Sequence, residues 1–402
     1  MNRRRVKITG IGPVTPAGVG REAFWKGILE PVSRVRPFKK LGDEYGPLVA
    51  AHLDNFDVSD YVNSVRIPSK VSRQTLFSIA GASLALADAA ISPSDLQQYN
   101  CAIISGSAVM DFGGVVSAID AIHRHGVRGA KPMTLAATTT SVTPCAIAAT
   151  FGIRARTMAI QNACCGGLDA IGFGARLVAE GEAEIAICGG TEAPLHRSPL
   201  IELRTAGLTP PTTDMPERLD RPFDLWRTTG VVSEGACMVV LEPESSPRPG
   251  YTFVSGYAYA TDRDNNLCGG LGVAIRLAIA DARLRPGDIE VISAWGPGHK
   301  LIDAAEAREI LSIFKDVLPQ IPVVSIKGAI GTPFAAAPAT QIAAAALGQR
   351  EGLIPPTVNW EYPDPACPLN LSRNARSIEH RRTLINAHGM GGVNAAMVLE
   401  RC

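Results

Sequence analysis

The chain has 402 residues, of which 46% are hydrophobic and 5% aromatic, and its 39 Lys and Arg against 38 Asp and Glu give a net charge of +1. This length exceeds one ordinary domain, and the near-zero charge excludes an electrostatic case for binding nucleic acid or an anionic membrane. We find no secretory leader and no apolar run of about 18 residues, so we expect a cytoplasmic protein without a membrane span.

The first half alternates short apolar runs with segments of helical spacing. In chain order we expect a strand from Val6, a helix at Arg21–Leu29, a surface insertion at 31–65, a helix at Gln74–Ala90, a strand at Asn100–Ile104, a helix at Pro144–Phe151, a short buried strand at Thr157–Ile160, a helix at Leu168–Glu180, and strands at Ala183–Cys188 and Cys237–Leu241.

After a linker at Glu242–Gly250, the second half repeats this rhythm. We expect strands at Thr252–Tyr259, Ile289–Ala294, Val323–Ile326, Thr383–Asn386 and Ala395–Leu399, with helices at Leu271–Arg283, Asp303–Phe314 and Phe334–Leu347. The alternation predicts an α/β protein with parallel-dominated sheets covered by helices. Two similar halves indicate a duplicated unit with domains at 1–245 and 250–402.

Nine cysteines are scattered through apolar segments, and none forms a Cys-x-x-Cys pair. We therefore expect reduced thiols, with no disulfide framework and no metal site. Gly10-x-Gly12 lacks the third glycine of a dinucleotide-binding loop and is interrupted by Pro13 and Pro16. We expect no bound cofactor.

The most informative stretch is Asn162-Ala163-Cys164-Cys165-Gly166-Gly167, between a predicted strand and a predicted helix. The positive end of a helix favours a thiolate, and adjacent glycines let backbone or a bound acyl group come close. This layout suits a cysteine nucleophile for acyl transfer. A buried structural cysteine is the alternative interpretation of the stretch on its own.

Motifs along nearly the whole chain resolve this choice, because together they resemble a β-ketoacyl synthase of the elongating type, in the thiolase superfamily. The motifs are Val6-Lys7-Ile8-Thr9-Gly10-Ile11-Gly12, Ala163-Cys164 with Gly167 and Ala170-Ile171-Gly172, Gly189-Gly190-x-Glu192, Arg221-Pro222-Phe223-Asp224, Glu234-Gly235-Ala236, Asp303-Ala304-Ala305-Glu306, Lys327, Pro355-Pro356-Thr357-Val358-Asn359, Asp364-Pro365 and Asn386-x-x-Gly389-x-Gly391-Gly392-x-Asn394-Ala395.

The resemblance implies a thiolase-like fold, with duplicated five-stranded mixed sheets in a layered α-β-α-β-α architecture. It also implies an obligate dimer that receives acyl chains from acyl carrier protein in fatty-acid or polyketide biosynthesis. In such enzymes a thiolate takes an acyl group from a carrier thioester. Malonyl-carrier then loses CO₂, and two histidines donate hydrogen bonds to the enolate oxygen.

Both of these histidines are replaced here. Trp295 stands in the first position, within Ala294-Trp295-Gly296-Pro297, and Thr332 stands in the second, five residues after Lys327. Indole has one N–H donor and cannot act as a base, and a threonine hydroxyl does not reach as far as an imidazole nitrogen. Losing one oxyanion donor lowers the rate about 10²–10³-fold, so we expect little decarboxylative condensation by this chain alone.

Two other histidines are candidates to compensate. His299 lies in a Gly-Pro-Gly-His turn, where we favour a solvated loop residue over a base. His388 lies where elongating synthases place a bulky gate residue. It is either a base paired with Cys164 or a polar plug that shapes the acyl tunnel, and the sequence favours neither.

The remaining site residues have supporting roles in our interpretation. Register against Gly167 favours Cys164 over Cys165 as the nucleophile, with Cys165 as a packing residue. We expect a retained structural network that matches the charged residues beside the family's site, made of Asp303, Glu306, Lys327 and Asn386. We expect Asp169 to be solvated or to cap its helix.

The favoured function is a degenerate, chain-length-factor-like subunit that pairs with an active β-ketoacyl synthase, as a heterodimer rather than a homodimer. Gly166-Gly167-Leu168-Asp169-Ala170 resembles that class, although its members typically carry glutamine where this chain keeps Cys164. The alternative is a Cys164-dependent acyltransferase or condensing enzyme with a non-standard Cys/His site. A third class is a scaffold that only binds acyl carrier protein. Acyl length, pathway and the identity of the partner are not encoded in recognisable motifs.

Overall fold

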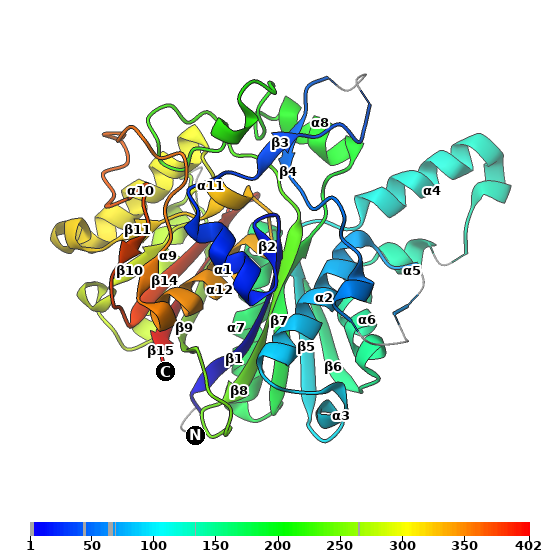
Figure 1. The fold of residues 1–402 in the computed structure, drawn as a ribbon, viewed down its shortest axis with the longest axis horizontal. Coiled ribbons are helices and arrows are strands. Elements are labelled where there is room, and N and C mark those ends of the chain that lie inside the picture. Colours follow the sequence, from blue (N-terminus) through cyan, green and yellow to red (C-terminus); the bar gives the residue numbers. More distant parts are fainter. Residues whose placement is uncertain (1–3, 43–45, 63–66, 69, 133, 264–265) are drawn as a thin grey trace.

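The computed structural model describes residues 4–42, 46–62, 67–68, 70–132, 134–263 and 266–402. Its centre is formed by two five-stranded sheets of the same order (Figure 1). The first has the order β6-β5-β7-β8-β1, with β6 at Ala155–Gln161, β5 at Cys101–Ser107, β7 at Ile185–Glu192, β8 at Gly235–Pro243 and β1 at Val6–Thr15. The second has the order β11-β10-β14-β15-β9, with β11 at Val323–Val324, β10 at Val291–Ser293, β14 at Arg382–Gly389, β15 at Val393–Arg401 and β9 at Thr252–Thr261.

The two sheets also share their strand directions. In each, the first three strands of the order are parallel and the last two are antiparallel to their neighbours. A short antiparallel contact between β1 and β9, Lys7 with Phe253 and Ile8 with Thr252, joins them. This repeated order is the duplication that the alternating sequence predicts.

Helices complete the layers. The helices α7 (Gly166–Glu180) and α12 (Ala336–Glu351) contact strands of both sheets and form the middle layer. One outer layer is α2 (Arg73–Asp88) with α6 (Val142–Phe151), and the other is α9 (Gly269–Asp281) with α10 (Lys300–Phe314). The predicted α-β-α-β-α architecture is therefore confirmed.

The middle layer is packed from small residues. Every residue from Ala336 to Gln349 in α12 is buried, and the helix is rich in alanine. In α7, a Cβ on Gly174 would lie 2.2 Å from the sulfur of Cys188 on β7. Small side chains let a helix approach two sheets at once, which explains the low aromatic content of the chain.

The remaining helices and strands lie outside these layers, and all but the 14-residue helix α4 are short. They are β2 at Gly18–Val19, α1 at Arg21–Leu29, β3 at Val35–Pro37, β4 at Val49–Ala51, α3 at Pro93–Leu96, α4 at Phe112–His125, α5 at Thr134–Thr138, α8 at Arg197–Thr205, α11 at Lys327–Ile330, β12 at Leu353–Ile354 and β13 at Arg376–Ser377. In the described part of the chain, no helix combines the length and apolar character needed to cross a membrane.

Three expectations need correction. The insertion at 31–65 is not confined to the surface. In its described part, β3 pairs with β4, and Phe38, Leu48 and Ala50 are buried in the core. A bridge between Ala51 and Ser233 ties β4 to the body of the fold. The expected buried strand at 157–160 is β6, whose residues are largely exposed because β6 is an edge of its sheet. We predicted no helix over the residues of α4, which stands away from the body of the molecule (Figure 1).

Candidate active site

The cysteine turn joins β6 to α7. Cys164 and Cys165 lie in one 3₁₀ turn directly before the helix. Ala163 has a left-handed backbone with φ of 44°, a conformation that costs about 1–3 kcal/mol outside glycine. Gly389 of β14 packs tightly here, since a Cβ on it would lie 3.0 Å from both the Ala163 Cβ and the Cys164 nitrogen.

The two glycines after the cysteines serve backbone packing. A Cβ on Gly167 would lie 2.2 Å from the carbonyl oxygen of Ala335, and one on Gly166 would lie 3.0 Å from that of Ser107. These contacts fix the start of α7 against β5 and against the loop before α12. The Cys164 thiol is thereby held at one position in the fold.

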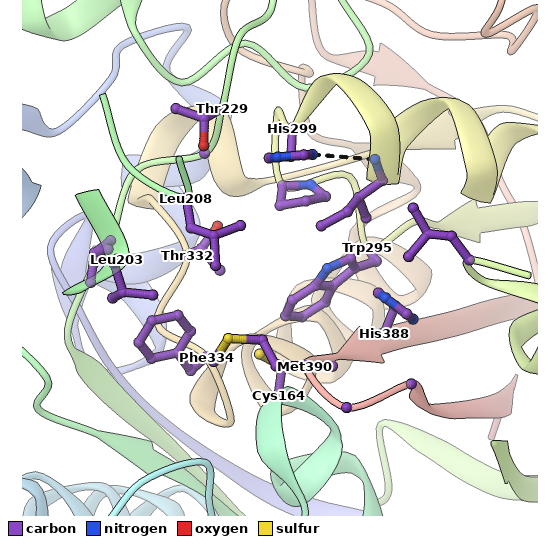
Figure 2. A pocket seen from close by; sticks show the side chains of 18 of the residues that line it. Cys164, Leu203, Leu208, Thr229, Trp295, His299, Thr332, Phe334, His388 and Met390 are labelled. Carbon is purple, nitrogen blue, oxygen red and sulfur yellow. Dashed lines mark hydrogen bonds between the residues drawn. The ribbon is translucent and has the colours of Figure 1, made fainter. Parts of the chain in front are cut away.

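Cys164 lines a mainly apolar pocket of about 250 Å³. Figure 2 shows Cys164 and Phe334 at one end of this pocket and His299 with Thr229 at the other. Trp295, Thr332 and His388 line it as well. The other four candidate residues are fully buried and do not line it: Asp303, Glu306, Lys327 and Asn386.

The Cys164 thiol is not activated in this environment. Burial, and next the negative charge of Glu192, raise its pKa to about 12, although the backbone N–H of Met390 and the Lys327 charge act in the opposite direction. Within the described residues, no hydrogen bond joins its sulfur to an imidazole. The helix end alone does not make this cysteine a thiolate.

Cys165 faces away from the pocket. Its thiol is buried and contacts the carbonyl oxygens of Ala387 and Val393 at 3.5 and 3.6 Å. These carbonyls belong to the β14–β15 pair, so Cys165 fills space between α7 and the second sheet. Cys164 alone of the two presents its side chain to the cavity.

Trp295 stacks on the buried lysine of the site. The Lys327 ammonium lies 4.0 Å from the centroid of the indole ring, which is a cation–π contact. In the described part of the chain, the Lys327 ammonium donates one hydrogen bond, to Gln341 Oε1 at 3.3 Å. Burial lowers the pKa of Lys327 to about 8. The indole therefore fills space and contacts a charged group at the position where the motifs predict a replaced imidazole donor.

Glu306 holds the turn that carries Trp295. Its carboxylate accepts the backbone N–H groups of Trp295 at 2.7 Å and Gly296 at 2.8 Å, and the side-chain amide of Asn386 at 2.6 Å. Burial raises the pKa of this carboxyl. Glu306 and Asn386 thus position the turn between β10 and α10.

Asp303 fixes a second loop. It accepts the backbone N–H of Phe223 at 2.7 Å and that of His299 at 3.1 Å, and Arg227 lies 3.6 Å away. Burial raises the pKa of Asp303 to about 7. These contacts are scaffolding, since neither Asp303 nor Glu306 reaches the pocket.

Thr332, the predicted replacement of the second histidine, has an unsatisfied polar group in the described structure. Its hydroxyl is buried and has no hydrogen-bond partner in the described structure, although its backbone N–H donates to Val231 at 2.7 Å. The hydroxyl is the shorter donor expected from the sequence, and it lies on the pocket wall.

His299 is the N-cap of α10, a half-buried pocket residue and not the solvated loop residue that we expected. Its Nδ1 accepts the backbone N–H groups of Leu301 at 3.3 Å and Ile302 at 3.4 Å. Figure 2 shows one hydrogen bond to the His299 ring on the pocket wall. An accepting Nδ1 assigns the proton of the neutral ring to Nε2, and burial lowers its pKa. The ring can therefore donate to a ligand, but its lone pair is already used, which disfavours the base role.

His388 has the opposite arrangement. Its Nδ1 lies 2.8 Å from Asn394 Oδ1, while the amide nitrogen of Asn394 donates to Asp262 and to Gly392. The amide oxygen can only accept, so Nδ1 of His388 carries the proton and Nε2 keeps its lone pair. Of the two histidines, His388 is the one whose tautomer suits a base.

Sequence reasoning missed several residues of the site. Gln341, the partner of Lys327, is a long polar residue in the alanine-rich α12, and that isolation was a usable signal. Leu203 and Phe334 line the pocket without any motif to mark them. Asp169 is buried and bonded to Tyr257 and Asn162, contrary to our expectation of a solvated or capping residue.

Comparison with known proteins places this site in a family. Residues 3–246 match the β-ketoacyl synthase N-terminal domain, and residues 252–361 match the β-ketoacyl synthase C-terminal domain. The chain belongs to the β-ketoacyl synthase family. The structural order of its strands and its cysteine turn agree with the motifs that first suggested this membership.

The similarity to other β-ketoacyl synthases extends over nearly the whole chain. The chain is 28% identical to 3-oxoacyl-[acyl-carrier-protein] synthase 2 of Coxiella burnetii over 100% of this chain and 99% of the relative. It is 30% identical to the tetracenomycin polyketide synthase ketoacyl synthase alpha subunit of Streptomyces glaucescens, over 99% and 97% of the two chains. The ishigamide ketosynthase/chain length factor structure superposes with a TM-score of 0.91 at 26% identity, with both chains covered completely.

Proposed function

We propose that this chain is a chain-length-factor-like subunit that pairs with an active β-ketoacyl synthase and does not itself perform decarboxylative condensation. The observation that carries the proposal is the pair Trp295 and Thr332. Trp295 packs on Lys327, and the Thr332 hydroxyl has no hydrogen-bond partner in the described structure. The sequence motifs align these two residues with the family's two imidazole donors. Without those donors the enolate from malonyl-carrier has no matched stabilisation.

The surface supports a pairing role. The strand β6 is an edge whose outer backbone groups pair with no strand among the described residues, and its seven residues include no proline. Long exposed edges of this kind pair with another strand. Met158 on β6 is 50% exposed, and Ile119 and Ile122 on α4 are 60% and 47% exposed. A second subunit that adds a strand at β6 would cover the edge.

The experiment is co-expression with a synthase that retains both histidines, followed by measurement of subunit composition and product. We expect a 1:1 complex that extends a malonate-fed acyl thioester. The tagged chain alone should yield no product. The proposal fails if the chain forms no complex with such a synthase, or if extension by the complex requires Cys164 of this chain and not the synthase's own cysteine.

One observation favours a second function. His388 lines the same pocket as the retained Cys164, and its hydrogen bond to Asn394 selects the tautomer whose Nε2 can accept a proton. A ligand-induced approach of the two would make a Cys/His pair for acyl transfer without decarboxylation. An acyl adduct in the intact mass of the isolated protein, lost in both Cys164→Ala and His388→Gln, would support this transferase role.

A further inference from the structure

A second cavity lies where the two sheets meet, away from the cysteine. It is a groove of about 650 Å³, formed by the starts of β1 and β9 and the ends of α7 and α9. None of its lining residues belongs to the pocket of Cys164. Four arginines line the groove: Arg4, Arg5, Arg176 and Arg283.

Three of these arginines have no salt-bridge partner in the part of the chain that the structure describes. Arg5 pairs with Glu244 at 3.0 Å and with Glu400 at 3.5 Å. Among the described residues, the salt bridges include no partner within 4.0 Å for Arg4, Arg176 or Arg283. In a chain with 39 cations and 38 anions, three unpaired guanidinium groups around one groove are a local excess.

Arg176 is the best-defined of the three. It is half-buried, and its guanidinium carbon lies 5.2 Å from the ring centroid of Tyr257 and 5.5 Å from that of Phe173. The rings restrict the plane of the guanidinium group. In the described structure the N–H groups of Arg176 have no protein acceptor. The Arg176 guanidinium can therefore donate hydrogen bonds to a ligand in the groove.

The charges around the groove nearly balance when its opposing groups are included. Asp281 and Glu400 are its two carboxylates, and Glu244, outside its lining, pairs with Arg5. The ends of α7 and α9 add about half a negative charge each. Two of the three carboxylates pair with Arg5, and the third, Asp281, is partly engaged by the backbone N–H of Tyr257 at 3.0 Å. Within the described structure, the groove therefore offers an anion the unpaired guanidinium groups of Arg176 and Arg283, and not a net positive charge.

We propose that this groove binds a small phosphorylated ligand, with Arg176 and Arg283 as its main contacts. Guanidinium groups bind phosphate oxygens through paired, charge-assisted hydrogen bonds. The groove also reaches the cysteine turn. Tyr257 donates to Asp169 at 2.7 Å, and Asn162, the residue before Ala163, donates to the other oxygen of Asp169 at 2.5 Å. A phosphate on Arg176 therefore lies beside the hydrogen-bonded chain that supports the nucleophile turn.

The test is calorimetric titration of the full-length protein with inorganic pyrophosphate at low ionic strength. We expect saturable binding that weakens about tenfold or more in Arg176→Gln and in Arg283→Gln, because each loses charge-assisted bonds. Added salt should weaken binding as well. Thermal unfolding of each variant establishes that it is folded, and Arg283 is exposed, so its replacement leaves the core intact.

Two comparisons make the result decisive. Arg373→Gln alters an exposed arginine outside the groove and should bind pyrophosphate like the wild type. Malonate, a dicarboxylate of similar charge, should bind more weakly than pyrophosphate. The proposal is overturned by absence of saturable binding to the wild type, by equal weakening in Arg373→Gln, by unchanged binding in both groove variants, or by malonate binding as tightly.

Discussion

At the scale of single residues, Trp295 and Thr332 determine which steps the pocket can support. Both stand on the wall of the Cys164 cavity, where the first offers a ring face to Lys327 and the second a short hydroxyl. Glu306 and Asn386 hold the Trp295 turn, so on our proposal the scaffold of a donor site remains although its imidazole donors are replaced. Placing histidines at both positions therefore tests directly whether the missing imidazole donors are what prevents decarboxylation.

The double variant Trp295→His/Thr332→His should raise malonyl-carrier decarboxylation at least about 10²-fold over wild type, since each restored donor is worth about 10²–10³. Released CO₂ and acetyl-carrier are the readouts. Leu208→His, which adds an imidazole elsewhere on the same pocket wall, is the control and should stay at the wild-type rate. A folded double variant no faster than that control would count against the assignment of these two positions.

Lys327 should make stability depend on pH. Its folded pKa, about 8, is depressed below 10.5 by burial, so between these pH values the unfolded chain binds more protons than the folded chain. Stability contributed by this group therefore rises with pH across that window. Relative to Lys327→Met, the wild type should gain about 3 kcal/mol in free energy of unfolding between pH 8 and 10.5. Urea titrations at both pH values measure this, and a pH-independent difference would contradict it.

The pKa of the Cys164 thiol is raised to about 12, so we predict that this thiol reacts slowly with alkylating reagents. At pH 8 only about one molecule in 10⁴ carries the thiolate, which is the reactive form. Iodoacetamide should label the exposed Cys145 well before Cys164 in the same sample, as followed by peptide mass spectrometry. Equal labelling of the two cysteines would show that Cys164 is activated and would favour the transferase role.

At the scale of elements, β6 and α4 hold the features that a partner would cover. Met158→Lys places a charge on the edge of β6, and we expect it to abolish the complex with an active synthase while leaving the chain folded. Leu277→Lys on α9 is a matched control, because Met158 and Leu277 are both 50% exposed. Size-exclusion chromatography with light scattering separates the outcomes. A complex that survives Met158→Lys, or fails equally with Leu277→Lys, argues against pairing at β6.

Elements differed in how well the sequence predicted them. The helix at 21–29 and the helix and strands around Cys164 follow local periodicity, and the structure has them within a few residues. The strand β6 was misjudged because an apolar run does not reveal whether a strand has one neighbour or two. The helix α4 was missed although Val115, Ile119 and Ile122 recur at helical spacing. What the sequence could not show is that the described residues of this chain leave that apolar side exposed.

At the scale of the whole molecule, the duplicated fold and its family were predictable, because motifs are spread along the chain and each half repeats one strand order. The replacement of two histidines by Trp295 and Thr332 rests on register against the family motifs and stays a prediction. The sequence does not predict the tautomers of His299 and His388 or the contact between Lys327 and Gln341. They depend on which residues, far apart in sequence, the two sheets bring together.

The most direct measurement is a condensation assay on the isolated, full-length chain with an acyl-carrier thioester and malonyl-carrier, compared with a synthase that has both histidines. We predict that the isolated chain releases no β-ketoacyl product above the no-enzyme rate. Extension at a rate comparable to that of the active synthase would contradict the account at its centre.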